Sequence, residues 1–585
     1  MSRRSERKGR PSPKAASSTP TPPKTRRAGS PRARSGPAAP AERGVWRWPV
    51  VGVLLVAAVA GVSVQRDRDD HPPATAAVDT AGLLPVASAA DALSSTWYCA
   101  GGTATGTKEG DAEQTVQIAN AADHSVTAKV TVVPSEGQPV TKAVDVPARG
   151  RADLVVSSVV KAPYAAAVIE IPGGQAAVSH VLGGPTGKAM AACSSSPSSN
   201  WYIPAGTSKP GTRQLLAVFN PFPSEAVVGV SFETDDGART PQKFEAVVVP
   251  GQRVALLDIS AVVTVRTQIA TTVNVRSGRV VVDQIQLANG TQDTAASLAV
   301  TPGAPQASPT WWFADGPAGE GLSTTMVVQN PSDDTADVQL QIRLDRAEAN
   351  GSVAPFEVSI PAHQYSEVDV SGAGRVPQGV GYTAAAVSTN GVPIVAERLV
   401  SEVAPASPTG MTITMGSPVT ATNWLVPVAS APYVSATTVV VTNPSSTDPV
   451  TISVSTVGGG ALKPVADGTG VQIAAGGRGG FQIPTGPNTP EVAVDVESDG
   501  PVVVEARTVF VTGGLAEPLA IPVQPSATVA ASGIPAVPPG EVVPSVPGAG
   551  PGDGGGGGTS VPNDLTTTTA APASTTPPAG ANPGG

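Results

Sequence analysis

The stretch VVQNPSDDTADVQLQIRL, residues 327–344, places an Asn-Pro turn directly before a segment in which apolar and polar residues alternate. Val338, Leu340 and Ile342 fall on one side of that segment, and Gln339 falls on the other. A period of two is typical of a half-buried β-strand, and proline cannot donate a hydrogen bond to a strand ladder. The stretch therefore predicts a turn followed by a strand with one buried face.

The same pattern recurs along the chain, marked by four tryptophans and by the asparagines that follow them. The tryptophans, in STWYCAGG, NWYIPAG, TWWFADG and NWLVPVA, are 104, 110 and 113 residues apart: Trp97, Trp201, Trp311 and Trp424. An Asn-Pro pair follows each of the last three after 19 residues, at Asn220, Asn330 and Asn443. In the first copy the asparagine is Asn120, and alanine replaces the proline. Regular internal copies of this kind indicate repeated domains.

Each copy contains six or seven short alternating segments separated by turns, in a chain with 63 glycines and 60 prolines. This composition and spacing predict an all-β fold of four tandem immunoglobulin-like β-sandwich repeats. A β-propeller-like closed array is the alternative, although the repeat length exceeds one blade. The predicted parts are a basic disordered cytoplasmic arm (1–47), a transmembrane helix (48–64), a linker (65–94), the repeats (95–197, 198–307, 308–420 and 421–524) and a disordered Pro/Gly/Thr-rich tail (525–585).

The N-terminal part predicts attachment to a membrane. Residues 1–47 carry 13 Lys and Arg against two Glu, and residues 48–64 contain no charge. Seventeen helical residues span ~26 Å, the short end of a membrane span, and the basic side stays in the cytoplasm. We expect a single-pass protein of the cell membrane with its bulk outside the cytoplasm; a cleaved signal peptide is the alternative. Since the arm has no aromatic residue before Trp46, no nucleic-acid partner is expected.

The two cysteines, Cys99 and Cys193, both fall in the first repeat on the predicted exported side. An oxidising compartment favours a disulfide between them. Closing a loop of this length stabilises a protein by roughly 4–5 kcal/mol in the chain-entropy model.

No catalytic, metal or cofactor motif stands out. The four histidines, His71, His124, His180 and His363, have no metal-pair spacing, and each is interpreted as a surface or turn residue. The sequence contains no GxSxG elbow and no phosphate loop between a strand and a helix. We therefore expect a protein that is not an enzyme and takes no metal or cofactor.

Two recurring features have both a structural and a functional interpretation. The tryptophans are interpreted as core residues of each sandwich, or alternatively as platforms that stack on a sugar or a partner. A polar residue lies in the middle of the last apolar strand of each copy: Ser179, Asp283, Glu397 and Glu505. We expect these positions to face solvent on an outer strand. The alternative is a ligand contact, or an ion pair between domains with Arg398 or Arg507.

The basic arm, the single span, the motif Trp97-Tyr98-Cys99, the Asn-Pro turns and the Pro/Gly/Thr tail together resemble an actinobacterial family of membrane-anchored exported proteins. That family is catalogued only as a domain of unknown function. The resemblance covers residues 95 to about 524. It implies a location and no catalytic residue.

These observations predict a non-catalytic cell-envelope protein whose β-repeats extend from the membrane as a rod and bind a cell-wall polymer or an envelope protein. A scaffold for a membrane glycosyltransferase or envelope-assembly complex is one alternative. A wall-glycan enzyme with a cleft between repeats is another, and it would need two acidic residues in one pocket.

Overall fold

The computed structural model describes residues 82–106, 110–291, 295–345, 353–427, 434–485, 492–511 and 513–526. The chain divides into two compact units, 1–84 and 85–585, and the strands of the described residues belong to the second. The predicted arm, transmembrane helix and nearly all of the tail lie outside the described residues. Within the described ranges, no helix has the length and apolar character needed to cross a membrane.

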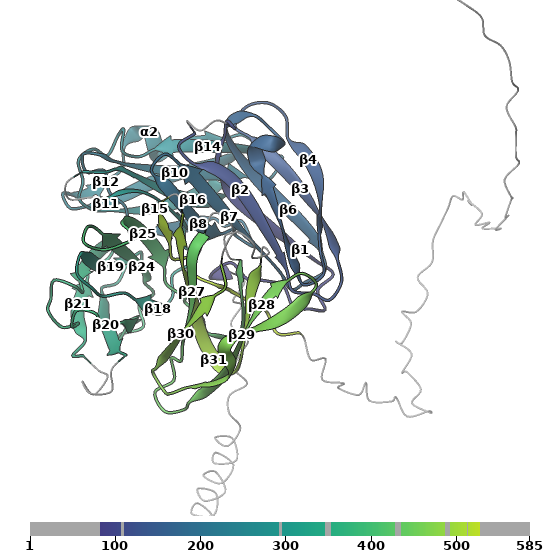
Figure 1. Ribbon diagram of the computed structural model, residues 1–585. Helices are drawn as coiled ribbons and strands as arrows, with labels where there is room; N and C mark the ends of the chain where they lie inside the picture. Colours follow the sequence, from purple (N-terminus) through teal and green to yellow (C-terminus); the bar gives the residue numbers. More distant parts are fainter. Residues whose placement is uncertain are drawn as a thin grey trace, which may run out of the picture. The chain divides into compact units, whose positions relative to one another are not determined.

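Repeat 1 is a sandwich of two four-stranded sheets (Figure 1). Its strands are β1 (Ser94–Ala104), β2 (Glu113–Asn120), β3 (Val126–Pro134), β4 (Val140–Val146), β5 (Gly150–Val155), β6 (Ala162–Pro172), β7 (Ala176–Gly184) and β8 (Gly187–Ala192), with a 3-10 turn at Val156–Ser158. One sheet has the order β4-β3-β6-β1 and the other β5-β2-β7-β8; a single parallel pairing of Thr103 with Glu113 joins them.

Repeats 2 and 3 have the same strand order. Repeat 2 contains β9 (Asn200–Ile203), β10 (Thr212–Asn220), β11 (Ala226–Thr234), β12 (Gly237–Arg239), α2 (Gln242–Glu245), β13 (Val247–Val249), β14 (Arg253–Asp258), β15 (Ile269–Ser277), β16 (Val281–Asn289) and β17 (Ala296–Pro302). Repeat 3 contains β18 (Thr310–Gly316), β19 (Leu322–Asn330), β20 (Ala336–Leu344), β21 (Phe356–Ile360), β22 (Gln364–Asp369), β23 (Tyr382–Ser388), β24 (Val395–Glu402) and β25 (Gly410–Met415). Their second sheets, β14-β10-β16-β17 and β22-β19-β24-β25, match β5-β2-β7-β8.

Repeat 4 follows the same plan with one long strand shared by both sheets. It contains β26 (Ala421–Pro427), β27 (Val434–Thr442), β28 (Val450–Gly458), β29 (Ala461–Ile473), β30 (Arg478–Ile483), β31 (Ala493–Phe510), β32 (Leu515–Ala516) and β33 (Ile521–Pro522). The first half of β31 pairs with β26 and β28, and its second half pairs with β27. The predicted all-β class is therefore confirmed.

The tryptophans and asparagines that mark the repeats are both buried. Trp97, Trp201, Trp311 and Trp424 are at most 1% exposed and lie in the apolar cores, so none of them can serve as a surface platform in this fold. Each asparagine side chain bonds two turns at once. Asn330 Nδ2, for example, donates to Asp334 O at 2.7 Å and to Ile360 O at 2.9 Å. This side chain therefore fixes the distance between the two turns that recur in every copy.

The four repeats form a closed ring instead of the expected rod. Strand β8 of repeat 1 contacts β17 of repeat 2, β17 contacts β25 of repeat 3, β25 contacts β32 of repeat 4, and β32 contacts β8 again. Figure 1 shows the green strands of repeat 4 lying beside the purple and blue strands of repeat 1. The all-buried pattern of β25 agrees with a packed centre. Each repeat therefore has two neighbours, and we name the four contact regions interfaces 1-2, 2-3, 3-4 and 4-1.

A short segment before β1 joins the last repeat and closes interface 4-1. Ala87 forms a parallel bridge with Val523; its N–H donates to Pro522 O at 2.9 Å, and its carbonyl accepts from the N–H of Gln524 at 2.9 Å. Leu425 and Ile521 of repeat 4 lie in the apolar core of repeat 1. The two ends of the folded unit are thus held together by backbone hydrogen bonds and shared apolar packing.

Ala87→Pro tests this closure, because proline removes the donated N–H and leaves Pro522 O without its partner. We expect a loss of about 1–3 kcal/mol in the free energy of unfolding. Amide exchange in β26 and at Val523 should rise while amides at interface 2-3 stay protected. Leu93→Ala, which changes a 94% exposed side chain of the same segment, is the control. Equal loss of protection at all interfaces would contradict the closure.

Candidate functional site: the interfaces between repeats

At interfaces 1-2, 2-3 and 3-4, the first of the two repeats supplies a backbone N–H that is not bonded within its own strand ladder. In β1, Cys99 pairs with Ala167 and pairing resumes at Gly102, so a bulge frees Ala100 and Gly101. In β18, the ladder is interrupted between Phe313 and Gly316 in the same way. Strand β9 ends at Ile203, just before Ala205. Because a buried N–H without a partner is costly, these positions require an acceptor from elsewhere.

The acceptors are the three carboxylates that the sequence singled out. Asp283 Oδ2 accepts the N–H of Ala100 at 3.1 Å, and Glu397 Oε2 accepts that of Ala205 at 2.6 Å. Glu505 accepts the N–H groups of Ala314 at 2.9 Å and Asp315 at 3.2 Å. In every case the carboxylate belongs to the next repeat.

These carboxylates are therefore buried, where a solvent-facing position was expected. Asp283 is 1% exposed, and Glu397 and Glu505 are 0% exposed. Their strands do have an outer face, but the neighbouring repeat covers it. The three acids lie at three different interfaces and do not converge in one pocket.

The residue after each of the first three polar positions, Ser179, Asp283 and Glu397, bonds or lies close to one of the two groups that meet at the following interface. His180 Nε2 lies 3.6 Å from Asp283 Oδ2, and Gln284 Nε2 donates to Ala205 O at 2.6 Å. Arg398 Nη2 donates to Glu505 Oε2 at 2.9 Å. His180 is fully buried, so its interpretation as a surface or turn residue is wrong; His124 and His363 are exposed, and His71 lies outside the described residues.

Interface 4-1 lacks this arrangement. The corresponding residues are Ser179 and Ala506, and Ser179 Oγ donates within repeat 1 to Gln117 Oε1 at 3.3 Å. The pairing of β26 with β31 runs unbroken from Asn423 to Pro427, so the strand frees no N–H there. Apolar clusters that include Val181, Phe510 and Val457 join the two repeats instead.

Burial raises the pKa of all three acids, and for Glu505 it does so against the opposing effect of Arg398. It raises the pKa of Glu397 to about 8 and that of Asp283 to about 8, although the bound N–H groups oppose the shift. Burial also lowers the pKa of His180 to about 4. A carboxyl group whose pKa is higher in the folded state is most stabilising below its unfolded pKa. That contribution is lost as the pH rises through about 8.

Glu397→Gln tests this linkage with a neutral side chain of nearly the same shape. In the unchanged protein we expect deprotonation of Glu397 to lower the free energy of unfolding by a few kcal/mol, on the order of 1.4 per pKa unit, between pH 5 and pH 8. The Gln variant should lose that contribution. The measurement is denaturant unfolding across this pH range, with the exposed Glu357→Gln as control. An unchanged pH profile in Glu397→Gln would contradict the assignment.

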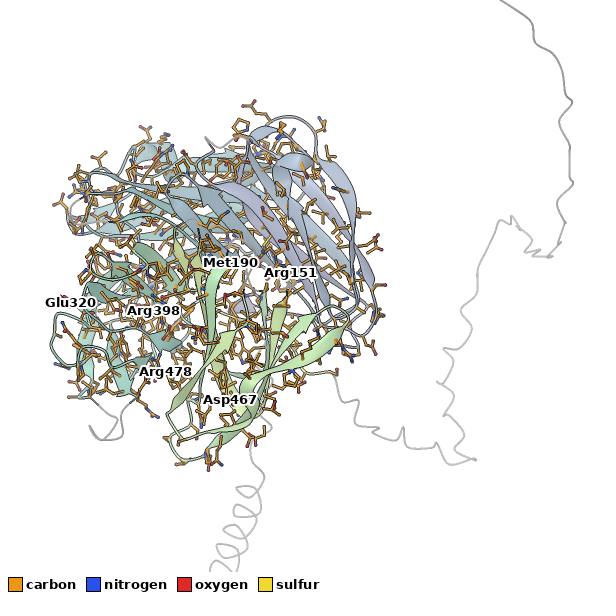
Figure 2. The ribbon with its side chains drawn as sticks, in the orientation of Figure 1. Arg151, Met190, Glu320, Arg398, Asp467 and Arg478 are labelled. Atoms are coloured by element: carbon orange, nitrogen blue, oxygen red, sulfur yellow. A yellow bond between two sulfur atoms is a disulfide. The ribbon has the colours of Figure 1, made fainter. Side chains whose placement is uncertain are left out.

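Interface 3-4 holds a group of ion pairs, and Figure 2 labels two of its arginines, Arg398 and Arg478. Arg398 is 0% exposed, and it bonds Glu505, Glu517 Oε2 at 3.1 Å and the carbonyl of Asp315. Arg507 pairs with Glu402 and Glu517, and Arg478 pairs with Asp315 and Asp345. The predicted alternative of inter-domain ion pairs with Arg398 or Arg507 describes this interface.

Arg398→Met should destabilise the protein by about 3–5 kcal/mol, because it leaves buried carboxylates without their cation. The Arg398→Met/Glu505→Gln double variant should recover part of the loss, since Glu505 then carries no charge. Denaturant unfolding measures both, and Arg276→Met at an exposed site is the control. Losses that simply add in the double variant would show that the two side chains do not interact.

The cysteine prediction is confirmed by a disulfide between Cys99 and Cys193. The bond ties β1 to the residue after β8. Cys99 directly precedes Ala100, whose N–H donates to Asp283. In the part of the chain that the structure describes, no three His, Cys, Asp or Glu side chains form a group that could hold a metal ion.

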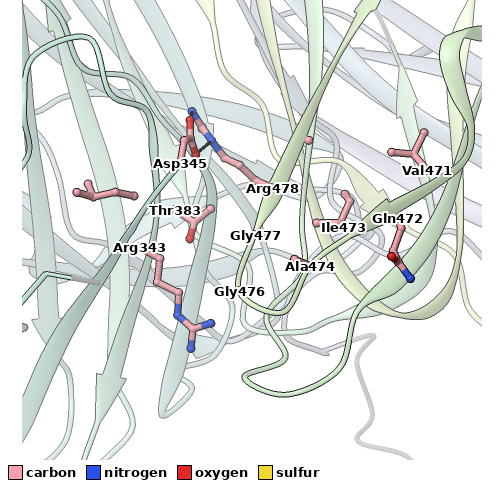
Figure 3. A pocket seen from close by; sticks show the side chains of 12 residues that line it. Arg343, Asp345, Thr383, Val471, Gln472, Ile473, Ala474, Gly476, Gly477 and Arg478 are labelled. Carbon is pink, nitrogen blue, oxygen red and sulfur yellow. Dashed lines mark hydrogen bonds and ion pairs between the residues drawn. The ribbon is translucent and has the colours of Figure 1, made fainter. Parts of the chain in front are cut away.

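A pocket that the sequence analysis did not predict opens at interface 3-4 (Figure 3). It has a volume of about 300 Å³ and lies between Arg343, Asp345 and Thr383 of repeat 3 and residues 471–479 of repeat 4. The repeat-4 wall is the turn AAGGRGG, residues 474–480, which replaces the proline-containing turns of the other repeats. This difference between the turns was the feature of the sequence that could have indicated the pocket.

The structure thus defines an all-β protein built as a closed ring of sandwich repeats. Residues 171–410 match the model of a family of unknown function, DUF5719. This match confirms the resemblance to a family catalogued only as a domain of unknown function. No curated protein matches the chain.

Two solved structures are similar only at a low level. The Streptomyces avermitilis alpha-L-rhamnosidase complexed with L-rhamnose is 11% identical, with a TM-score of 0.12 over 67% of this chain and 55% of the rhamnosidase chain. A tetra-tandem repeat from the extending region of a large adhesion protein is 12% identical, with a TM-score of 0.09 over 75% of this chain and 100% of that one.

Proposed function

We propose that this chain is a non-catalytic, single-pass cell-envelope protein. Its closed ring of four β-sandwiches lies outside the cytoplasm and presents a binding surface to a cell-wall polymer or an envelope protein. The observation that carries the proposal is the disulfide between Cys99 and Cys193, since such bonds persist in oxidising compartments. The basic arm and the uncharged stretch at 48–64 add the expected anchor.

The use of the buried acids supports a binding role over a hydrolytic one. A glycoside hydrolase needs two carboxyl groups on opposite sides of one scissile bond. Asp283, Glu397 and Glu505 instead bind backbone N–H groups at separate interfaces, and each is closed to solvent. These residues therefore hold the ring together, and the exposed surface is left for partners.

Reporter fusions test the topology. An export-dependent phosphatase fused after residue 64 should be active, and the same enzyme fused after residue 47 should be inactive. Activity of only the second fusion would overturn the proposal.

In the full chain, denatured without reductant, we also expect no thiol to react, because the two cysteines are joined.

A further inference from the structure

The pocket at interface 3-4 is built by two arginines that cross the interface in opposite directions. Arg343 of repeat 3 lies against Gly476 of repeat 4, and Arg478 of repeat 4 lies against Gly381 of repeat 3. A Cβ atom at either glycine would collide with the arginine that covers it, and Gly476 also has a φ of +66°. The two glycines therefore make room for both guanidinium groups in the wall of the pocket.

The two arginines differ in their partners. Arg478 is fixed by a two-point ion pair with Asp345, at 2.7 and 2.8 Å, and by Asp315 Oδ1 at 2.5 Å. Arg343 has no carboxylate among the described residues within ion-pair distance, and its acceptor there is Ser445 O at 3.5 Å. Figure 3 shows Arg343 pointing away from the Asp345–Arg478 pair. A guanidinium group has five N–H donors, so most of those on Arg343 are available to a ligand.

The walls also offer hydrogen-bond partners for hydroxyl groups. The Asp345 carboxylate lies in the same pocket as Arg343; Arg478 already compensates its charge, but each of its oxygens keeps a lone pair that can accept a hydrogen bond from a hydroxyl group. The Thr383 hydroxyl can bond a hydroxyl group, and Leu344 and Ile473 supply apolar contact. The volume of about 300 Å³ falls at the lower end of the range of ligand pockets. One hydroxyl-rich ring with a single carboxylate fits these features.

We propose that this pocket binds one acidic sugar residue, with the carboxylate on Arg343 and the ring hydroxyls on Asp345 and Thr383. The assignment names a ligand class for the proposed envelope role and rests on that role only for the source of the sugar. The reporter fusions test the location of the ring, and the titration below tests the pocket on purified protein. Failure of one is therefore distinguishable from failure of the other.

The test is a titration of the full-length protein in a phosphate-free buffer, followed by ligand-observed NMR, with glucuronate, glucose and inorganic phosphate as probes. We expect glucuronate to bind and glucose to bind at least tenfold more weakly. Arg343→Gln should weaken glucuronate binding at least tenfold. Arg276→Gln, which removes one exposed positive charge from repeat 2, should leave it unchanged. The thermal transition of each variant reports its folding.

Three results would overturn the proposal. Glucuronate binding that survives Arg343→Gln in a folded protein would place the site elsewhere. Equal binding of glucose and glucuronate would show that the carboxylate is not recognised. Phosphate that displaces glucuronate at equal concentration would show a general anion site without selection for a sugar.

Discussion

A peptide N–H that leaves the strand ladder in one repeat is bound by a carboxylate from the next repeat, and three of the four interfaces between the sandwiches are built on this contact. The bulge after Cys99 frees Ala100, and Asp283 reaches across to accept its hydrogen bond. Leaving either the N–H or the acid without its partner would cost stability, because both groups are buried. The contact therefore makes adjacent repeats interdependent in a way that apolar packing alone does not.

Small apolar residues allow this close approach. The three alanines whose N–H groups donate to these acids each belong to an apolar cluster shared with the neighbouring repeat; they are Ala100, Ala205 and Ala314. A larger side chain at these positions would push the repeats apart and lengthen the hydrogen bond to the carboxylate. A different polar side chain lies at each of these contacts. His180 lies beside Asp283, Gln284 bonds the residue that Glu397 binds, and Arg398 bonds Glu505. Interface 3-4 combines this contact with a network of ion pairs and an open pocket.

The closing interface follows a different principle, because a ring made from a linear chain must bring together two ends that have no covalent connection. Here Ala87 pairs with Val523, and side chains of repeat 4 enter the core of repeat 1. Since the disulfide also ties β1 to the end of repeat 1, the first strand is held by its own repeat and by Asp283 of repeat 2.

The sequence by itself determined the all-β class and the disulfide, and it singled out the tryptophans and asparagines that prove to be buried. These follow from local periodicity, from spacing and from cysteine chemistry, all of which can be read along the chain. In VQLQIRL, for example, the alternation correctly placed Val338, Leu340 and Ile342 in the core. Only the tertiary structure decided that the repeats close into a ring and that Asp283, Glu397 and Glu505 are buried. Alternation reports two faces of a strand, but it does not report that a second repeat covers the polar one. The pocket around Arg343 likewise depends on residues 343–345, residue 383 and residues 471–479, which only the folded chain brings together.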